Sequence, residues 1–336
     1  MGHRRRRLRS LLDPDVLGVD LIDVVRHLDG ALSDLAGGSG APPGFDARRF
    51  LAPGVPRIRP VLVLLSARAA QPEGEDGPAR FPDPSTEQLA VAAELLHVAI
   101  VLHDAALGRQ GGRRRRAARR LITGAVGVLG GNHLTLRALE LSRTSEAPEI
   151  VGDLLDAMRE ISEGHALAQR LDTGNPTPDD VLGVADGHSG AVFSFACRAG
   201  ARIAGAERPV ITALGRYGRH AGIAWHIAED LAALDLDGDD PAGSVEDRAA
   251  DRRPSFTVSL ACARDPELSE AWARLSLQPD TGLATEIAHR IEASGALTTG
   301  RETLAQEAWA ARRSLMTIRP SPHRDALDRL VMGMAR

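Results

Sequence analysis

The segment EQLAVAAELLHVAIVLHDAAL, residues 87–107, decides the fold class of this chain. His97 and Asp104 lie in a run that is mostly apolar, and the pattern predicts a long helix with one face in a core. The same periodicity continues along the chain between turns that contain Gly or Pro. We expect helices at 87–107, 117–142, 149–171, 178–205, 208–235, 255–263, 267–275 and 279–294, with two more before the C-terminus. Because no alternating strand pattern is found, the sequence predicts an all-α fold, a single-domain helical bundle.

The composition excludes several classes of function. Hydrophobic residues make up 43% and charged residues 26% of the 336 residues, which is typical of a globular protein. Aromatic residues make up only 3%, which argues against a base-stacking surface, and the net charge of −4 argues against general nucleic-acid binding. The sequence contains no lysine, so its 41 basic side chains are all arginine.

The sequence divides into an N-terminal region, residues 1–45, and a helical domain, residues 46–336. The first region has a basic tail, a helical pattern at 14–35 and a flexible break at 37–44. The start lacks the apolar segment of a signal peptide, and no run reaches about 18 uninterrupted apolar residues, so no transmembrane segment is expected. The two cysteines cannot form a disulfide framework. Together these features predict a cytoplasmic protein.

Two groups of polar residues near the first long helix are candidates for chemistry. His97 and Asp104 lie seven residues apart, nearly on one helical stripe. They are either a core histidine with hydrogen-bond partners and a carboxylate at a helix end, or part of a ligand site at the mouth of the bundle. Arg113 and Arg114 belong to an arginine run. This run is either a solvated loop or a grip for a phosphorylated ligand, because guanidinium groups match phosphate oxygens two at a time.

A third group lies in the segment WHIAED, where His226 precedes Glu229 and Asp230 by three and four residues. This spacing can place metal ligands on one helix face, but it also fits an ordinary acidic helix end. The adjacent residues 235–246 partly match a calcium-binding loop. Asp240 stands where that loop needs glycine for its sharp turn, so we exclude calcium binding there.

These pieces occur in the order found in the trans-isoprenyl diphosphate synthase (polyprenyl synthetase) family, and the chain resembles that family from about Gly54 to Leu260. The family motif GGKRLRPxL is similar to GVPRIRPVL at 54–62, and ELIHxxSLxHDDxxD is similar to ELLH at 94–97 followed by LHD at 102–104. Six further segments are similar to family motifs: 113–114, 129–141, 163–165, 188–191, 225–233 and 241–244.

The resemblance implies a metal-assisted reaction. In that family, two acidic clusters on facing helices hold magnesium ions, which bind the diphosphate of an allylic substrate and draw it off to leave a carbocation. Here DAALG at 104–108 keeps one carboxylate of the first cluster, and EDLAA at 229–233 keeps two of the second. The resemblance therefore assigns catalysis and binding of Mg²⁺, with fewer ions than the family norm, to Asp104, Glu229 and Asp230.

The resemblance also implies a set of basic contacts to the substrates. Pro56 stands where the family has a lysine, so one of these contacts is lost. The remaining substrate-binding residues are Arg113 and Arg114 for the allylic diphosphate, Arg57 and His97 for isopentenyl diphosphate, and His188, His226 and Arg253.

Three functions remain open. We favour a divergent prenyltransferase, or a single-substrate cyclase-like enzyme, that acts on an allylic prenyl diphosphate. The second is a catalytically impaired subunit of a heteromeric polyprenyl diphosphate synthase, and the third is a binding protein for isoprenoid diphosphates. Family members are dimers, so the resemblance implies a homodimer or a heterodimer with an active synthase. Ala99 and Ile100, just upstream of the first cluster, imply a tail cavity that is open to long products.

Overall fold

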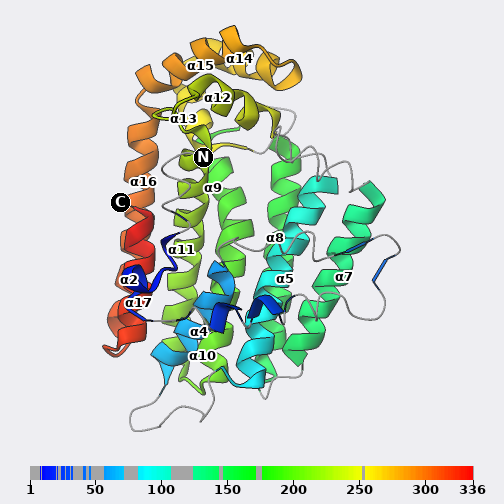
Figure 1. The fold of residues 1–336 in the computed structure, drawn as a ribbon, viewed down its shortest axis with the longest axis vertical. Coiled ribbons are helices and arrows are strands. Elements are labelled where there is room, and N and C mark those ends of the chain that lie inside the picture. The colour runs from blue at the N-terminus through cyan, green and yellow to red at the C-terminus, as the bar shows by residue number, and fades with distance from the viewer. Residues whose placement is uncertain are drawn as a thin grey trace.

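A computed structural model describes residues 57–71, 82–106, 124–143, 147–171, 176–251 and 254–335, together with parts of 8–46. Over these residues the regular structure is helical and no strand is found, which confirms the predicted all-α fold. The long helices run alongside one another in a bundle (Figure 1). They are α4 (Ile58–Ala70), α5 (Pro84–Ala106), α7 (Gly124–Arg143), α8 (Glu149–Leu171), α10 (Ala191–Ile203), α11 (Arg208–Leu234), α16 (Ala296–Ser314) and α17 (Pro322–Met334).

Four shorter helices lie across one end of the bundle and close it there (Figure 1). They are α12 (Pro241–Ala250), α13 (Phe256–Arg264), α14 (Pro266–Leu277) and α15 (Thr281–Ala293). These helices have a hydrophobic cluster of their own, and the partly buried Leu260 and Leu297 pack against both this cluster and the main core. The capping helices are therefore packed onto the bundle as part of one folded unit.

Helix α5 is the centre of the bundle, as its apolar sequence predicts. From Leu89 to Val98 every residue except His97 is buried. This helix is long and apolar enough to cross a membrane, but 78% of its most apolar stretch is buried inside the protein. The backbone groups of a core helix are hydrogen-bonded within the helix, and its apolar side chains pack against other helices. The high hydropathy of α5 therefore reflects burial in the core.

Three local predictions differ from the structure. Helix α2 spans only Pro14–Leu17 and ends at Gly18, whose φ of 69° stops it, so the helical pattern predicted at 14–35 is interrupted there. The expected helix at 178–205 is interrupted by one turn of π-helix, η2 (Asp186–Gly190), between α9 (Pro178–Ala185) and α10. Residues 241–244, which lie outside every expected helix, form the first turn of α12, which Asp240 caps through the Gly243 amide.

The two cysteines and the C-terminal helix are the last features of the core. Cys197 and Cys262 are both free, in agreement with the prediction that they form no disulfide framework. Burial raises the pKa of the Cys197 thiol to about 12, so this residue behaves as a small core side chain. After the short turn η3 (Leu315–Thr317), α17 packs against α11, where the buried Tyr217 hydroxyl donates a hydrogen bond to the Leu327 carbonyl oxygen at 2.7 Å.

Candidate functional site

Four polar side chains meet where α5, α8 and η2 come together. Asp104, near the end of α5, is only 7% exposed, and its Oδ1 lies 3.5 Å from Nε2 of His165 on α8. The His165 ring packs against the ring of His188 in η2, with centroids 4.4 Å apart, and against His103 at 5.9 Å. We call these four residues the histidine cluster.

Small residues and the π-turn make room for this cluster. A side chain at Gly131 on α7 would overlap the His103 ring, and one at Gly164 on α8 would meet the His188 ring. The π-turn adds a residue to the helical path and thereby changes which side chain points inward, a device found at many functional sites. Here it accompanies a buried His188, at the position where the resembling family motif has a lysine.

The hydrogen bonds of His165 leave one ring nitrogen facing the carboxylate. Its Nδ1 lies 3.0 Å from the Ile161 carbonyl oxygen, which can only accept, so Nδ1 carries the proton. In the neutral ring Nε2 is then an acceptor, and it is buried beside Asp104 Oδ1, which is also an acceptor. A proton on Nε2 or a bound cation would lie between this nitrogen and the carboxylate oxygen.

His103 differs from His165 in its electrostatic surroundings. Burial lowers the pKa of His103, and the neighbouring His165 lowers it further, while a hydrogen-bond interaction with Asn132 on α7 opposes the shift. The His103 Nε2 and Asn132 Oδ1 atoms are 3.3 Å apart. His103 is therefore held neutral more strongly than a histidine in water.

An apolar cavity of about 400 Å³ adjoins the cluster. His103, Asn132 and His165 line one part of it, and the rest is formed by apolar and small polar side chains from α5, α7 and α8. These are Leu96, Ala99, Ile100, Val128, Thr135, Met158, Ile161 and Ser162. The cavity thus combines a polar group of donors with an apolar pocket, as a ligand with a charged head and a hydrocarbon tail requires.

A second charged group joins α4, α5 and α11. Arg57 donates to Asp29 at 2.7 Å and to Glu94 on α5 at 3.2 Å, and its side chain is 2% exposed. Arg59 is also buried, and its Nε has no hydrogen-bond partner among the described residues. Burial lowers the pKa of Arg59, whereas Glu94 and the exposed Glu229 on α11 oppose this shift. Arg57 is thus paired with two carboxylates of the protein, and Arg59 is the arginine with a donor left for a ligand.

Asp230 has a different environment from its neighbour Glu229. One carboxylate oxygen accepts from Arg248 Nε at 3.1 Å and Nη2 at 3.0 Å. The other accepts from the Ser255 hydroxyl at 3.0 Å and the Thr257 amide at 2.9 Å. Asp230 therefore fastens α11 to the capping helices, and its lone pairs are used within the protein.

The remaining expected site residues fall into two sets. His97 on α5 and His226 on α11 are partly exposed, and His226 interacts electrostatically with Asp230. Arg113, Arg114 and Arg253 lie outside the described residues.

The carboxylates present fit magnesium only in a reduced form of the expected site. Across the part of the chain that the structure describes, no three His, Cys, Asp or Glu side chains are grouped to hold a metal ion. Mg²⁺ in nucleotide- and phosphate-binding sites, however, is commonly held by one or two carboxylates, with substrate phosphates and water completing the shell. Asp104, beside an acceptor nitrogen, and the exposed Glu229 fit that donor set, whereas Asp230 with its four hydrogen bonds does not.

Three residues of this site, His103, His165 and Arg59, were not among the expected site residues. His165 and Arg59 lie in segments that resemble family motifs, EGH at 163–165 and RIRP at 57–60, so their position was a usable signal. The choice of Arg57 over Arg59 depends on which arginine is neutralised by Asp29 and Glu94, and sequence alone does not show that.

Comparison with known proteins identifies the family to which this all-helical bundle belongs. The polyprenyl synthetase family profile matches residues 47–283. The chain is 25% identical over 276 residues to octaprenyl diphosphate synthase of Escherichia coli, covering 81% of this chain and 82% of that protein. It is 33% identical over 183 residues to (2E,6E)-farnesyl diphosphate synthase of Mycobacterium tuberculosis, covering 53% and 48% of the two chains.

Solved structures show the same relationship. The crystal structure of a decaprenyl diphosphate synthase from Rhodobacter capsulatus superposes with a TM-score of 0.77 at 26% identity, covering 96% of this chain and 98% of the other. A polyprenyl synthetase from Streptomyces coelicolor superposes with a TM-score of 0.76 at 24% identity, covering 94% and 98%. The bundle is thus of the all-α isoprenoid synthase type, and the chain belongs to the polyprenyl synthetase family.

Proposed function

We propose that this protein is a prenyltransferase that binds an allylic prenyl diphosphate, with the hydrocarbon tail in the cavity between α5, α7 and α8. The observation that carries the proposal is the junction between that cavity and the histidine cluster. His103 and His165 belong to both. A diphosphate bound at the cluster would have its tail directed into the apolar space without exposing it to water.

The residues of the site divide the work of such a reaction. The buried His188 would donate to a diphosphate oxygen and stabilise the charge that develops as the leaving group departs, while His165, whose Nε2 lies beside Asp104, would border the metal-binding carboxylate. Asp104 and Glu229 would hold Mg²⁺, which when bound neutralises the diphosphate. Arg59 would bind the second substrate, isopentenyl diphosphate, through its guanidinium group, whose Nε has no hydrogen-bond partner among the described residues. The cavity walls would exclude water from the cationic end of the prenyl chain.

The test is turnover and binding by the purified protein. The protein is incubated with Mg²⁺ and dimethylallyl, geranyl, farnesyl or geranylgeranyl diphosphate, each with and without isopentenyl diphosphate, and products are identified by mass. We expect Asp104→Asn and Glu229→Gln each to reduce turnover and magnesium-dependent substrate binding about 100-fold or more. The control variants Asp156→Asn and Glu292→Gln change exposed carboxylates on α8 and α15 and should behave as wild type. Unchanged binding and turnover in both site variants would rule out these metal-binding roles.

A second candidate function is that of a catalytically weak subunit of a heteromeric synthase. Two observations favour it: the acidic clusters are reduced, and large apolar side chains are exposed on α7 and α8. Val128 is 44% exposed, Leu129 53%, Leu136 59% and Leu155 50%, which is typical of a surface covered by another chain. We propose that this face forms the dimer contact, in a homodimer or with an active synthase.

The two candidates differ in a simple measurement. An enzyme forms product alone, whereas a subunit binds prenyl diphosphate alone but changes product yield or length only when a synthase from the same organism is added. Size-exclusion chromatography with light scattering gives the mass of the assembly in each case. Leu136→Glu should dissociate a dimer that uses this face, while Leu277→Glu, on the exposed end of α14, should leave its mass unchanged.

A further inference from the structure

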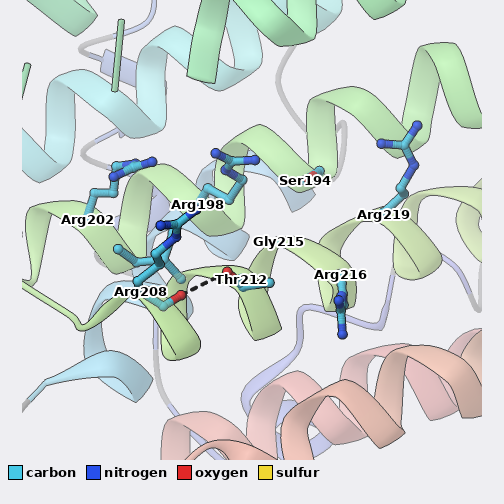
Figure 2. Close-up of a pocket in the computed structure, with 9 residues that line it drawn as sticks. Ser194, Arg198, Arg202, Arg208, Thr212, Gly215, Arg216 and Arg219 are labelled. Carbon is cyan, nitrogen blue, oxygen red and sulfur yellow. Dashed lines mark hydrogen bonds between the residues drawn. The ribbon is translucent and has the colours of Figure 1, made fainter. Parts of the chain in front are cut away.

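A second cavity, of about 610 Å³, lies between α10 and α11 and shares no residue with the histidine cluster or the apolar cavity. Five of its nine lining residues are arginines (Figure 2). Arg198 and Arg202 come from α10, and Arg208, Arg216 and Arg219 come from α11. We call this cavity the arginine groove.

None of the lining residues carries a carboxylate. The two α10 arginines share an acidic partner, Asp153 on α8, a buried residue that accepts hydrogen bonds from both Arg198 and Arg202. One carboxylate therefore serves two guanidinium groups. Glu149 adds a weaker electrostatic interaction with Arg202. Arg198 keeps a buried Nε without a hydrogen-bond partner among the described residues, so its donors are not all used.

Arg208 and Arg216 add charge from the other wall. They are exposed, and within the described part of the chain neither forms an ion pair. They lie two turns apart on α11, with Thr212 between them, and the Thr212 hydroxyl is bonded to the Arg208 carbonyl oxygen at 2.9 Å (Figure 2). Guanidinium groups on both sides of a concave space, at spacings of one or two helical turns, match an anion with several phosphate groups.

We propose that the arginine groove is a second anion site, which binds a small polyphosphate-bearing molecule and acts on the histidine cluster. The lining contains one large apolar side chain, Ile211, and no aromatic ring. The recognised part is therefore the phosphate chain itself, because the lining offers nothing to stack on a base or to hold a hydrocarbon tail. The concave shape favours a small molecule over a flat lipid surface.

Arg219 provides the route from the groove to the histidine cluster. It lines the groove, and it also donates to both Asp186 oxygens, at 2.6 and 2.7 Å, and lies 3.2 Å from Glu160. Asp186 is the first residue of η2, the π-turn that contains His188. An anion in the groove competes with Asp186 for Arg219, and this competition loosens or shifts the turn that positions His188.

The binding test uses tripolyphosphate as the probe, in EDTA and without Mg²⁺, and isothermal titration calorimetry measures its affinity. We expect Arg208→Gln/Arg216→Gln to weaken groove binding by about tenfold or more, because each removes a charge-assisted contact. The control Arg274→Gln/Arg313→Gln makes the same change of net charge at two exposed arginines on α14 and α16 and should bind as wild type. The variant Asp104→Asn/Glu229→Gln should also keep this binding, since it alters only the other site.

The coupling is measured by hydrogen exchange of the amides at 186–190, which needs no catalytic activity and so does not depend on the proposed reaction. Tripolyphosphate should change exchange there in wild type and in Asp104→Asn/Glu229→Gln, but not in Arg208→Gln/Arg216→Gln. Equal affinity of the groove variant and wild type would overturn the site. Unchanged exchange at 186–190 in saturated wild-type protein would overturn the coupling. Binding to phosphatidylglycerol vesicles is measured with the same double variant. If Arg208→Gln/Arg216→Gln loses more affinity for these vesicles than for tripolyphosphate, the small-molecule assignment is overturned in favour of a lipid surface.

Discussion

Replacement of Asp230 by asparagine tests whether this carboxylate has a structural role or is a metal ligand. The side chain accepts two hydrogen bonds from Arg248 and one each from Ser255 and Thr257, and Arg248 is itself only 5% exposed. An asparagine side chain would have the same shape, but it would leave the Arg248 charge buried without a counter-charge and would turn an amide donor toward other donors. Removal of one partner from a buried ion pair typically costs 3–5 kcal/mol, so we expect Asp230→Asn to lower the free energy of unfolding by about 3–5 kcal/mol.

The pH dependence of stability provides a second, independent test of this structural role. Burial acts to raise the pKa of Asp230, but Arg248 and the hydrogen bonds from Thr257 and Ser255, with His226, outweigh it, and the pKa is lower than its usual value. A group with a lowered pKa in the folded state stabilises the protein above its unfolded pKa of about 3.9, and this contribution is lost as the pH falls through the folded value. The stability difference between wild type and Asp230→Asn should therefore be full at pH 7 and shrink below about pH 4.

The assay is urea unfolding followed by circular dichroism at 222 nm, from pH 7 down to the lowest pH at which wild type stays folded. Asp239→Asn, an exposed position in the turn before α12, is the control and should change stability by less than about 0.5 kcal/mol. If Asp230→Asn unfolds like the control but loses magnesium-dependent binding, Asp230 is a metal ligand and its structural role is refuted.

Two further predictions concern packing. Ala99→Phe places a large ring in the cavity wall and should shorten the products by one or more isoprene units, measured by mass spectrometry; an unchanged product distribution would show that the prenyl tail does not use this cavity. Gly218→Ala should lower the free energy of unfolding by about 1–3 kcal/mol, because the added methyl group would overlap the Phe193 carbonyl oxygen where α10 and α11 touch. Gly152→Ala on α8, where nothing lies within 4 Å of the new methyl group, is its matched control and should instead stabilise the helix by about 0.5–1 kcal/mol in the same urea assay.

The helices that the sequence predicts best are those whose apolar pattern is long and whose ends carry strong signals. The predicted 149–171 agrees residue for residue with α8, and 208–235 differs from α11 by one residue. Helix α12 is short, and its sequence, PAGSVEDRAA, has Gly and Ser in the first turn, so local propensity gives no clear prediction. It forms because Asp240 caps it and because Val245 and Ala249 are buried against the capping helices.

Part of the candidate site could also be predicted. Asp104 and His188 lie in segments that resemble family motifs, and the structure brings both into the histidine cluster. The roles within the site depend on which partners the fold supplies. Arg57 and Arg59 are two residues apart, yet Arg57 contacts Asp29 and Glu94 while Arg59 keeps an unused donor. Glu229 and Asp230 are adjacent, yet one is exposed and the other accepts four hydrogen bonds.

By itself, the sequence determined that the chain is an all-α bundle, because the period of apolar residues follows from helix geometry and is visible within each short segment. Its ordered motifs were also enough to indicate the polyprenyl synthetase family. The tertiary structure alone decided which charges are neutralised inside the protein and which can face a ligand, and it alone assembled the arginine groove from two helices. Ion pairing and desolvation depend on groups that are distant in sequence, such as Asp230 and Arg248 or Asp153 and Arg202, so they are fixed only when the helices pack.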